Sequence, residues 1–146
     1  MVEPFVNLRR EQGRRRDDGC GDDVAERLAT AVIGAAIEVH RVLGPGLPEM
    51  VYERALAHEL TLHNILFERQ ALLPVVYKGV EVGEGRMDLL IDNRLVVELK
   101  FCDGLNDVHR AQVRTYLLLT GHRLGLLINF NVPVLRDGIR RVINSH

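Results

Sequence analysis

Between residues 66 and 102 the sequence holds three runs typical of β-strands, separated by very short turns. The runs are L-F-E-R-Q-A-L-L-P-V-V-Y, V-E-V-G-E-G-R-M-D-L-L-I and L-V-V-E-L-K-F-C, and the turns are K-G and D-N-R. Turns of this length join neighbouring antiparallel strands. The segment therefore predicts a three-stranded meander, and the rest of the chain has to pack around it.

Two amphipathic helices are predicted ahead of the meander. Apolar residues recur at helical spacing over residues 23–43, where Asp22 or Asp23 can cap the helix, and a second helix is predicted over residues 48–64. The linker G-P-G-L-P combines a glycine that ends the first helix with a proline suited to the first turn of the second. The two helices are therefore expected to be separate elements.

A helix and a further strand follow the meander. The helix is predicted over residues 107–120, with Asn106 as its N-cap and Gly121 just past its end. R-L-G-L-L-I-N-F at 123–130 is predicted as a fourth strand, and a short final element follows it. The order α-α-β-β-β-α-β predicts an α/β fold with a mixed central sheet flanked by helices.

Length and charge indicate one globular domain and favour no particular partner. The chain has 146 residues, enough for one domain with a proper core, and a formal net charge of −1. A local basic groove is still sufficient for binding nucleic acid. Residues 1–21 are predicted to be a disordered charged leader, and residues 22–146 to be the domain. The alternative for the leader is a basic arm that contacts phosphates.

The cysteines and the hydropathy pattern indicate the compartment. Cys20 and Cys102 favour free thiols in a reducing environment over a disulfide framework or a zinc site. No run of about 18 apolar residues is present, and the first residues lack the apolar region of a signal peptide. We therefore expect a cytoplasmic protein without a membrane partner.

Two carboxylates and a lysine interrupt the apolar strands of the meander. Alternation along R-M-D-L-L-I predicts two faces, one with Arg86, Asp88 and Leu90 and the other with Met87, Leu89 and Ile91. Along L-V-V-E-L-K, Glu98 and Lys100 share a face. A tight turn joins the two strands, so Asp88 and Glu98 are expected to meet across them.

These three charged residues point to a bound cation. Charges in such apolar surroundings are costly when buried without partners. A divalent cation removes that cost, because carboxylate oxygens are the hard ligands it prefers. Lys100 beside it can hold a water or a developing negative charge. The alternative is a structural ion pair on a half-exposed strand.

Polar residues on the predicted helices are further candidates for the site. Glu49 lies at the head of the second helix, either as part of the site or as a favourable charge at the helix N-terminus. His109, Gln112 and Tyr116 form one stripe at i, i+3 and i+7 of the third helix. His109 can contact a phosphate or serve in packing or hydrogen bonding.

Three helix residues have less specific expectations. Glu53, one turn past Glu49, is either another candidate acid of the site or, as we expect, a residue that faces solvent or pairs with a basic residue. Tyr52 is expected in the core, in one stripe with Leu56 and Leu60. His40 either approaches the site or packs in the helix interface.

The segments also resemble a known family. G-P-G-L-P-E-M-V-Y-E, with Gly46, Glu49 and Tyr52, is similar to the signature of the small GxxExxY proteins. The resemblance continues through F-E-R-Q, P-V-V-Y-K-G, the D-L-L and V-V-E-L-K strands, A-Q-x-x-x-Y-L and G-L-L-I-N-F-N-V-P, and it spans about residues 22–144. That family is placed in the PD-(D/E)XK nuclease-like superfamily, whose restriction-endonuclease-like fold is built on an αβββαβ core.

The resemblance implies roles for individual residues. Glu49, Asp88 and Glu98 would bind the metal, Mg²⁺ or Mn²⁺, together with the backbone carbonyl of Leu99. Lys100 would orient the attacking water or stabilise the transition state. Gln112 and Tyr116 match a Q-x-x-x-Y helix and would support the site and the substrate phosphate, with His109 as a further substrate contact.

The leading hypothesis is therefore a metal-dependent phosphodiesterase that hydrolyses nucleic acid, with DNA favoured over RNA. A second hypothesis is an inactive nuclease-like module that binds nucleic acid or a protein partner. A third is a purely structural ion-pair cluster. A homodimer or a larger complex is plausible for a domain of this size that cuts duplex.

Overall fold

The structure, a computed structural model, describes residues 19–144. Residues 1–18 of the predicted leader lie outside this range. Helix α2 spans Gly19–Leu43, so it begins before the predicted start at 23 and includes the last residues assigned to the leader. The predicted start at 23 was therefore wrong: Asp22 lies inside the first turn instead of capping the helix, and its carboxylate pairs with Arg123. That contact is long-range, so a local capping pattern does not reveal it.

The remaining elements follow the predicted order. After α2 come α3 (Glu49–Leu62), β1 (Phe67–Tyr77), β2 (Val80–Ile91), β3 (Leu95–Lys100), α4 (Asp107–Thr120), β4 (Leu124–Asn129), a short 3₁₀ helix η1 (Leu135–Gly138) and β5 (Ile139–Ile143). The predicted bounds of α4 are confirmed, and the final element comprises η1 and β5. In the described part of the chain, no helix is long and apolar enough to cross a membrane.

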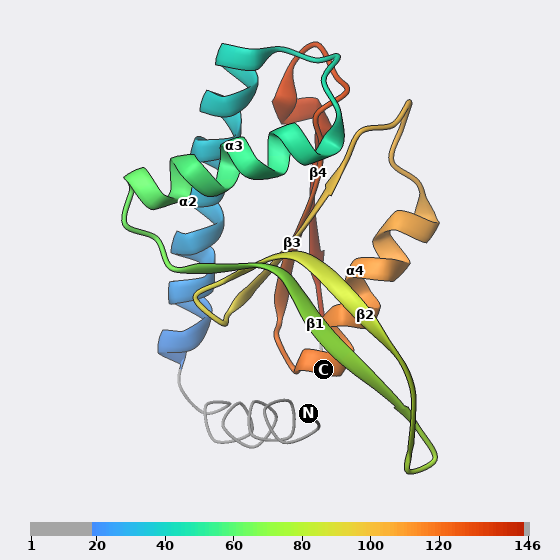
Figure 1. The fold of residues 1–146 in the computed structure, drawn as a ribbon. Coiled ribbons are helices and arrows are strands. Elements are labelled where there is room, and N and C mark those ends of the chain that lie inside the picture. The colour runs from blue at the N-terminus through green and yellow to red at the C-terminus, as the bar shows by residue number, and fades with distance from the viewer. Residues whose placement is uncertain (1–18, 145–146) are drawn as a thin grey trace.

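The described strands form one five-stranded sheet in the order β1-β2-β3-β4-β5. The pairs β1/β2, β2/β3 and β4/β5 are antiparallel, whereas β3 and β4 are parallel. Helix α4 connects the two parallel strands. Figure 1 shows α2 and α3 on one side of the sheet and α4 on the other. The predicted α/β fold with a mixed, helix-flanked sheet is confirmed.

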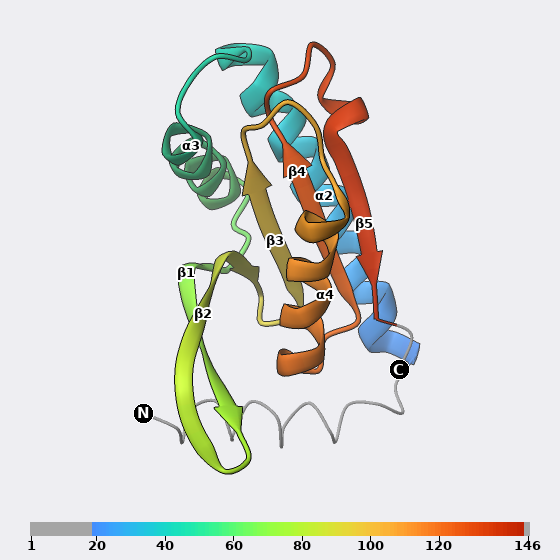
Figure 2. The same ribbon diagram turned by 90° about the vertical axis from the view of Figure 1, so that its right-hand side faces the viewer.

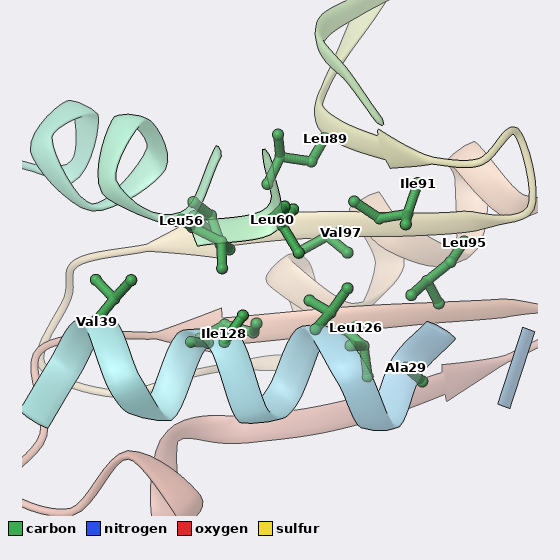
Figure 3. Close-up of a cluster of buried hydrophobic side chains, with 14 of the residues drawn as sticks. Ala29, Val39, Leu56, Leu60, Leu89, Ile91, Leu95, Val97, Leu126 and Ile128 are labelled. Atoms are coloured by element: carbon green, nitrogen blue, oxygen red, sulfur yellow. The ribbon is translucent and has the colours of Figure 1, made fainter. Parts of the chain in front are cut away.

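The larger core lies between the sheet and helices α2 and α3 (Figure 3). Small residues of α2, including Ala29 and Ala36, are fully buried and let the helix lie close to the strands. The stripe Tyr52, Leu56 and Leu60 of α3 is also completely buried, as predicted. Burying such side chains stabilises the fold by about 1.5–3 kcal/mol each, which fixes α3 and its first residue against the sheet.

A second core lies under α4. Val113 and Leu117 of that helix pack on Val96 of β3 and Leu127 of β4, all of them fully buried. The Asn106 side chain accepts a hydrogen bond from the His109 N–H at 3.0 Å, which starts the helix. α4 is therefore fixed over the same face of β3 that carries Glu98 and Lys100.

At one position in the hairpin β1–β2, the side chains that faced one core begin to face the other. Leu89 belongs to the core under α2 and α3, whereas Met87 belongs to the core under α4. The predicted grouping of Met87 with Leu89 and Ile91 was therefore wrong. Gln70, opposite this point in β1, has a positive φ of 52°, which interrupts the pleat. Beyond this position the hairpin projects past the body of the sheet (Figure 2).

Candidate active site

Asp88 and Glu98 meet across β2 and β3, as predicted. The main-chain N–H of Asp88 donates to Glu98 Oε1 at 2.9 Å, and the main-chain N–H of Leu99 donates to Asp88 Oδ2 at 2.8 Å. Regular pairing between the two strands covers Leu89–Ile91 and stops before Asp88. The two carboxyl groups thus take the place of ladder hydrogen bonds where the strands separate.

Both carboxyl groups are held where ionisation is unfavourable. Glu98 is only 2% exposed, and burial, followed by the nearby charge of Asp88, raises its pKa to about 9. Burial is also the main cause that raises the pKa of Asp88, while its hydrogen bond from Leu99 acts in the opposite direction. At neutral pH, positive charge close to this pair would stabilise it.

Glu49 joins the pair from the start of α3. It is the first residue of the helix, and Pro48 precedes it in an extended conformation. Glu49 is exposed overall, and partial desolvation of its carboxyl group is the largest cause that raises its pKa. The next cause is the charge of Asp88, so the two carboxylates are close enough to interact electrostatically. The alternative role of Glu49, a favourable charge at the helix N-terminus, does not require it to lie near Asp88.

Tyr52 holds the loop that positions Glu49. Its hydroxyl donates to the Gly44 carbonyl oxygen at 2.5 Å and accepts from the Leu47 N–H at 3.1 Å. Between them, Gly46 has a φ of 109°, which is open to glycine and strained for other residues. The tyrosine ring stacks on Phe130 with centroids 4.6 Å apart. Tyr52 is thus a core residue, as expected, that also fixes the entry into α3.

Lys100 ends β3 beside the carboxylates. Its positive charge favours the ionised forms of Glu49, Asp88 and Glu98, and so partly offsets the rise in their pKa values. The chain after Lys100 is fixed by Asn129, whose side chain donates to the Cys102 carbonyl oxygen at 2.9 Å and accepts the Cys102 N–H at 3.1 Å. The ammonium group therefore extends from a rigid strand end.

Glu53 lies next to this group, and the structure confirms one of the two environments expected for it, a basic partner. It does not face solvent: its side chain is 6% exposed and forms an ion pair of 2.8 Å with Arg69, the basic partner left open as the alternative. Gln70 donates from Nε2 to Glu53 and, at 3.4 Å, to Asp88 Oδ1. The i, i+4 spacing of Glu49 and Glu53 was a usable signal, because it places both on one helix face.

Helix α4 brings Gln112 and Tyr116 to the other side of the site. Gln112 Nε2 donates to the Tyr116 hydroxyl oxygen at 3.3 Å. Burial, and then the charge of Glu98, raises the pKa of Tyr116, so the phenol lies near the carboxylate pair. The ring lies over Gly85 of β2, where an added Cβ would come within 2.9 Å of Tyr116 Cε1.

The two histidines considered in the sequence are engaged in structural contacts. His109 Nδ1 accepts the Asn106 N–H at 3.2 Å, which completes the capping box of α4. His40 is buried and its Nε2 lies 2.8 Å from the Val132 carbonyl oxygen, in tilted contact with Phe130. The packed alternative therefore holds for His40.

The carboxylate oxygens of this region are ligands of the kind that a divalent cation prefers, but they are not arranged around a common centre. Within residues 19–144, no three His, Cys, Asp or Glu side chains form a preformed metal site. Desolvation is the largest cause that raises the pKa values of Glu49, Asp88 and Glu98, and the charge of a neighbouring carboxylate adds to it. A bound cation would oppose both effects, because it stabilises the ionised carboxylates. Oxygen donors of this kind fit Mg²⁺ or Mn²⁺.

Comparison with known proteins agrees with this geometry. The sequence model of the PD-(D/E)XK nuclease superfamily matches residues 26–142. No curated protein gives a significant match. Among solved structures, one described as "Crystal structure of SSO0001" is similar at a TM-score of 0.50 and 19% identity, covering 100% of this chain and 79% of that one. That likeness concerns the fold alone. With its restriction-endonuclease-like sheet and the family match over most of its length, the chain belongs to the PD-(D/E)XK nuclease superfamily.

Proposed function

We propose that the protein is a divalent-metal-dependent phosphodiesterase that hydrolyses nucleic acid. The observation that carries this proposal is the pair of Asp88 and Glu98, which main-chain N–H groups hold side by side between β2 and β3. Glu49 at the start of α3 and Lys100 at the end of β3 are close enough for charge interactions with this pair. A purely structural ion pair needs one carboxylate for one lysine. Three carboxylates with raised pKa values indicate a site that gains from a further positive charge.

The proposed metal ligands are the three carboxylates, with the backbone carbonyl of Leu99 as an additional donor. When bound, Mg²⁺ or Mn²⁺ supplies charge neutralisation at the phosphate and makes a water more acidic. Asp88 and Glu98 each have one oxygen held by a main-chain N–H, so their orientation is fixed before any ligand arrives.

The remaining residues act on the phosphate and the water. Lys100 orients the attacking water or stabilises the negative charge that develops on the phosphate oxygens as the P–O bond breaks. Gln112 and Tyr116 orient the phosphate from α4, and His109, in the first turn of the same helix, is a further substrate contact.

The finer assignments also belong to this proposal. The G-P-G-L-P-E-M-V-Y segment and the role of Tyr52 in it support membership of the GxxExxY group. We propose DNA as the preferred substrate, a cytoplasmic location consistent with the free thiol of Cys102, and a homodimer or larger complex when both strands of a duplex are cut.

The test is a cleavage assay with the full chain stripped of metal. Single- and double-stranded DNA and RNA are incubated with Mg²⁺, Mn²⁺ or EDTA. We expect cleavage with metal, no cleavage with EDTA, and a loss of about 10²–10³-fold in Lys100→Ala. Lys78→Ala, in the exposed β1–β2 turn, is the matched control. If wild type and Lys100→Ala are equally inert on every substrate, the enzymatic assignment fails.

One observation favours a second candidate function, binding without cleavage. Asp88 and Glu98 each accept a main-chain hydrogen bond, so the site holds together without a cation. A binding module predicts nucleic-acid affinity that is unchanged by EDTA and by Lys100→Ala. Fluorescence anisotropy with labelled oligonucleotides separates this from the enzyme, whose tight binding depends on the metal.

A further inference from the structure

A continuous chain of hydrogen bonds runs from the surface of β1 to Asp88. Arg69 pairs with Glu53 Oε2 at 2.8 Å, and Gln70 Nε2 donates to Glu53 Oε1. The same Gln70 nitrogen donates to Asp88 Oδ1 at 3.4 Å, while Leu99 N–H holds Oδ2 of that carboxylate at 2.8 Å. Both oxygens of Asp88 are thus approached by donors, one from β3 and one from β1.

The backbone of Gln70 is strained at the residue that makes this link. Gln70 has a φ of 52°, in the left-handed region that residues with a Cβ rarely adopt. The other described non-glycine residues with positive φ are Asn64, Lys78, Asp92 and Asn93, and all of them lie in turns. Gln70 alone among these lies within a strand. Strain of this kind persists where the surrounding structure requires it and is concentrated at functional sites.

The burial and charge of Glu53 match a supporting role. Its carboxylate is almost fully buried, and its charge is compensated by Arg69. Both Glu53 oxygens already accept hydrogen bonds, so it is poorly placed to bind a cation itself. Its charge nevertheless reaches Asp88 and Glu49.

We propose that Gln70 is a positioning residue for metal binding, which orients the Asp88 carboxylate and is itself oriented by the buried Glu53. The inference rests on the proposed function, because it takes Asp88 as a metal ligand. Partners behind a metal ligand fix its orientation, and losing one weakens metal affinity by about 10–100-fold. The link also ties Asp88 to α3, the helix that carries Glu49.

The experiment measures Mn²⁺ binding by isothermal titration calorimetry with the full chain, without any substrate. Gln70→Ala and Glu53→Gln are each expected to weaken Mn²⁺ binding by about 10–100-fold. The double variant is expected to lose no more Mn²⁺ affinity than the single variant with the larger loss, because the two residues act in one chain of hydrogen bonds. Circular dichroism confirms that each variant is folded.

Matched controls separate positioning from stability. Asn64→Ala changes another left-handed residue, in a turn, and Glu59→Gln makes the same substitution on α3 at a carboxylate paired with His63. Both are expected to bind Mn²⁺ as wild type does. Gln70→Gly relieves the backbone strain and serves if Gln70→Ala does not fold. It is expected to be at least as stable as Gln70→Ala and to bind Mn²⁺ equally weakly.

The outcomes distinguish this inference from the proposed function. Wild-type affinity for Mn²⁺ in Gln70→Gly and Glu53→Gln overturns the positioning role and leaves the nuclease proposal intact. Weakened Mn²⁺ binding in both variants supports the positioning role even if wild type cleaves no nucleic acid. Wild-type protein that binds no Mn²⁺ overturns both.

Discussion

The main chain of Asp88 donates a hydrogen bond to the side chain of Glu98, at 2.9 Å, where a regular ladder would have joined two main chains. The Glu98 side chain thus contributes to the pairing of β2 and β3, and it also carries a titratable group. Folding and ionisation are therefore coupled at this position, and the coupling has measurable consequences.

The first prediction concerns stability against pH in the metal-free protein. The pKa of Glu98 is raised from 4.5 to about 9, so the folded state keeps a proton that the unfolded chain releases. The stabilising contribution is complete below pH 4.5 and is lost as the pH rises toward about 9. Asp88 and Glu49, whose pKa values are also raised, act in the same direction. Urea unfolding in EDTA should show this decline.

Glu98→Gln is the variant that isolates this effect. The amide keeps an oxygen to accept the Asp88 N–H and has no proton to lose. Its stability should decline less steeply with pH than that of wild type. An equally steep decline in both proteins would show that Glu98 is not the group responsible.

The second prediction concerns the pH dependence of Mn²⁺ binding. Because Glu98 keeps its proton at neutral pH, a cation must displace that proton in order to bind. Affinity should therefore rise as the pH increases toward about 9, with proton release. Calorimetry in buffers of different ionisation enthalpy measures the released protons, and a pH-independent affinity without release would contradict the prediction.

The third prediction concerns Tyr52. Tyr52→Phe keeps the ring stack on Phe130 and removes the hydroxyl that holds Gly44 and Leu47. It should lower the free energy of unfolding by about 1–3 kcal/mol, because the partly buried main-chain groups of Gly44 and Leu47 lose their hydrogen-bond partner. Tyr77→Phe, on the exposed hairpin, is the control and should be nearly neutral. Equal unfolding free energies for the two variants would mean that the loop needs no support from Tyr52.

The fourth prediction compares two glycines of β2. A Cβ on Gly85 would meet the Tyr116 ring at 2.9 Å, whereas one on Gly83 meets nothing within 4 Å. Gly85→Ala should therefore destabilise by about 1–3 kcal/mol and displace Tyr116, while Gly83→Ala should not destabilise. In a Tyr116→Ala background, Gly85→Ala should lose its effect in thermal unfolding. A persistent effect there would place the clash elsewhere.

The sequence predicted the elements because their signals are local. Periodicity, turn dipeptides and the Asn106 cap act within a few residues, and the observed bounds of α4 match them. The meeting of Asp88 with Glu98 was also predictable, because a tight turn leaves two strands little freedom.

The parts that sequence reasoning missed depend on contacts between distant residues. Strict alternation placed Met87 with Leu89, and the unusual backbone of Gln70 overrides that alternation. The burial of Glu53 requires Arg69, which the hairpin brings over α3. The pairing of Asp22 with Arg123, which accompanies the early start of α2, spans most of the chain. None of these contacts leaves a periodic pattern in the sequence.

The change of sides in the hairpin has a consequence for how the molecule unfolds. The same two strands contribute Leu89 to one apolar layer and Met87 to the other. Unfolding of either core would displace the strands that also form part of the other core. A stable species with only one core folded is therefore disfavoured. We therefore expect both layers to melt together in a single cooperative transition, with the carboxylates at the point where the two halves depend on each other.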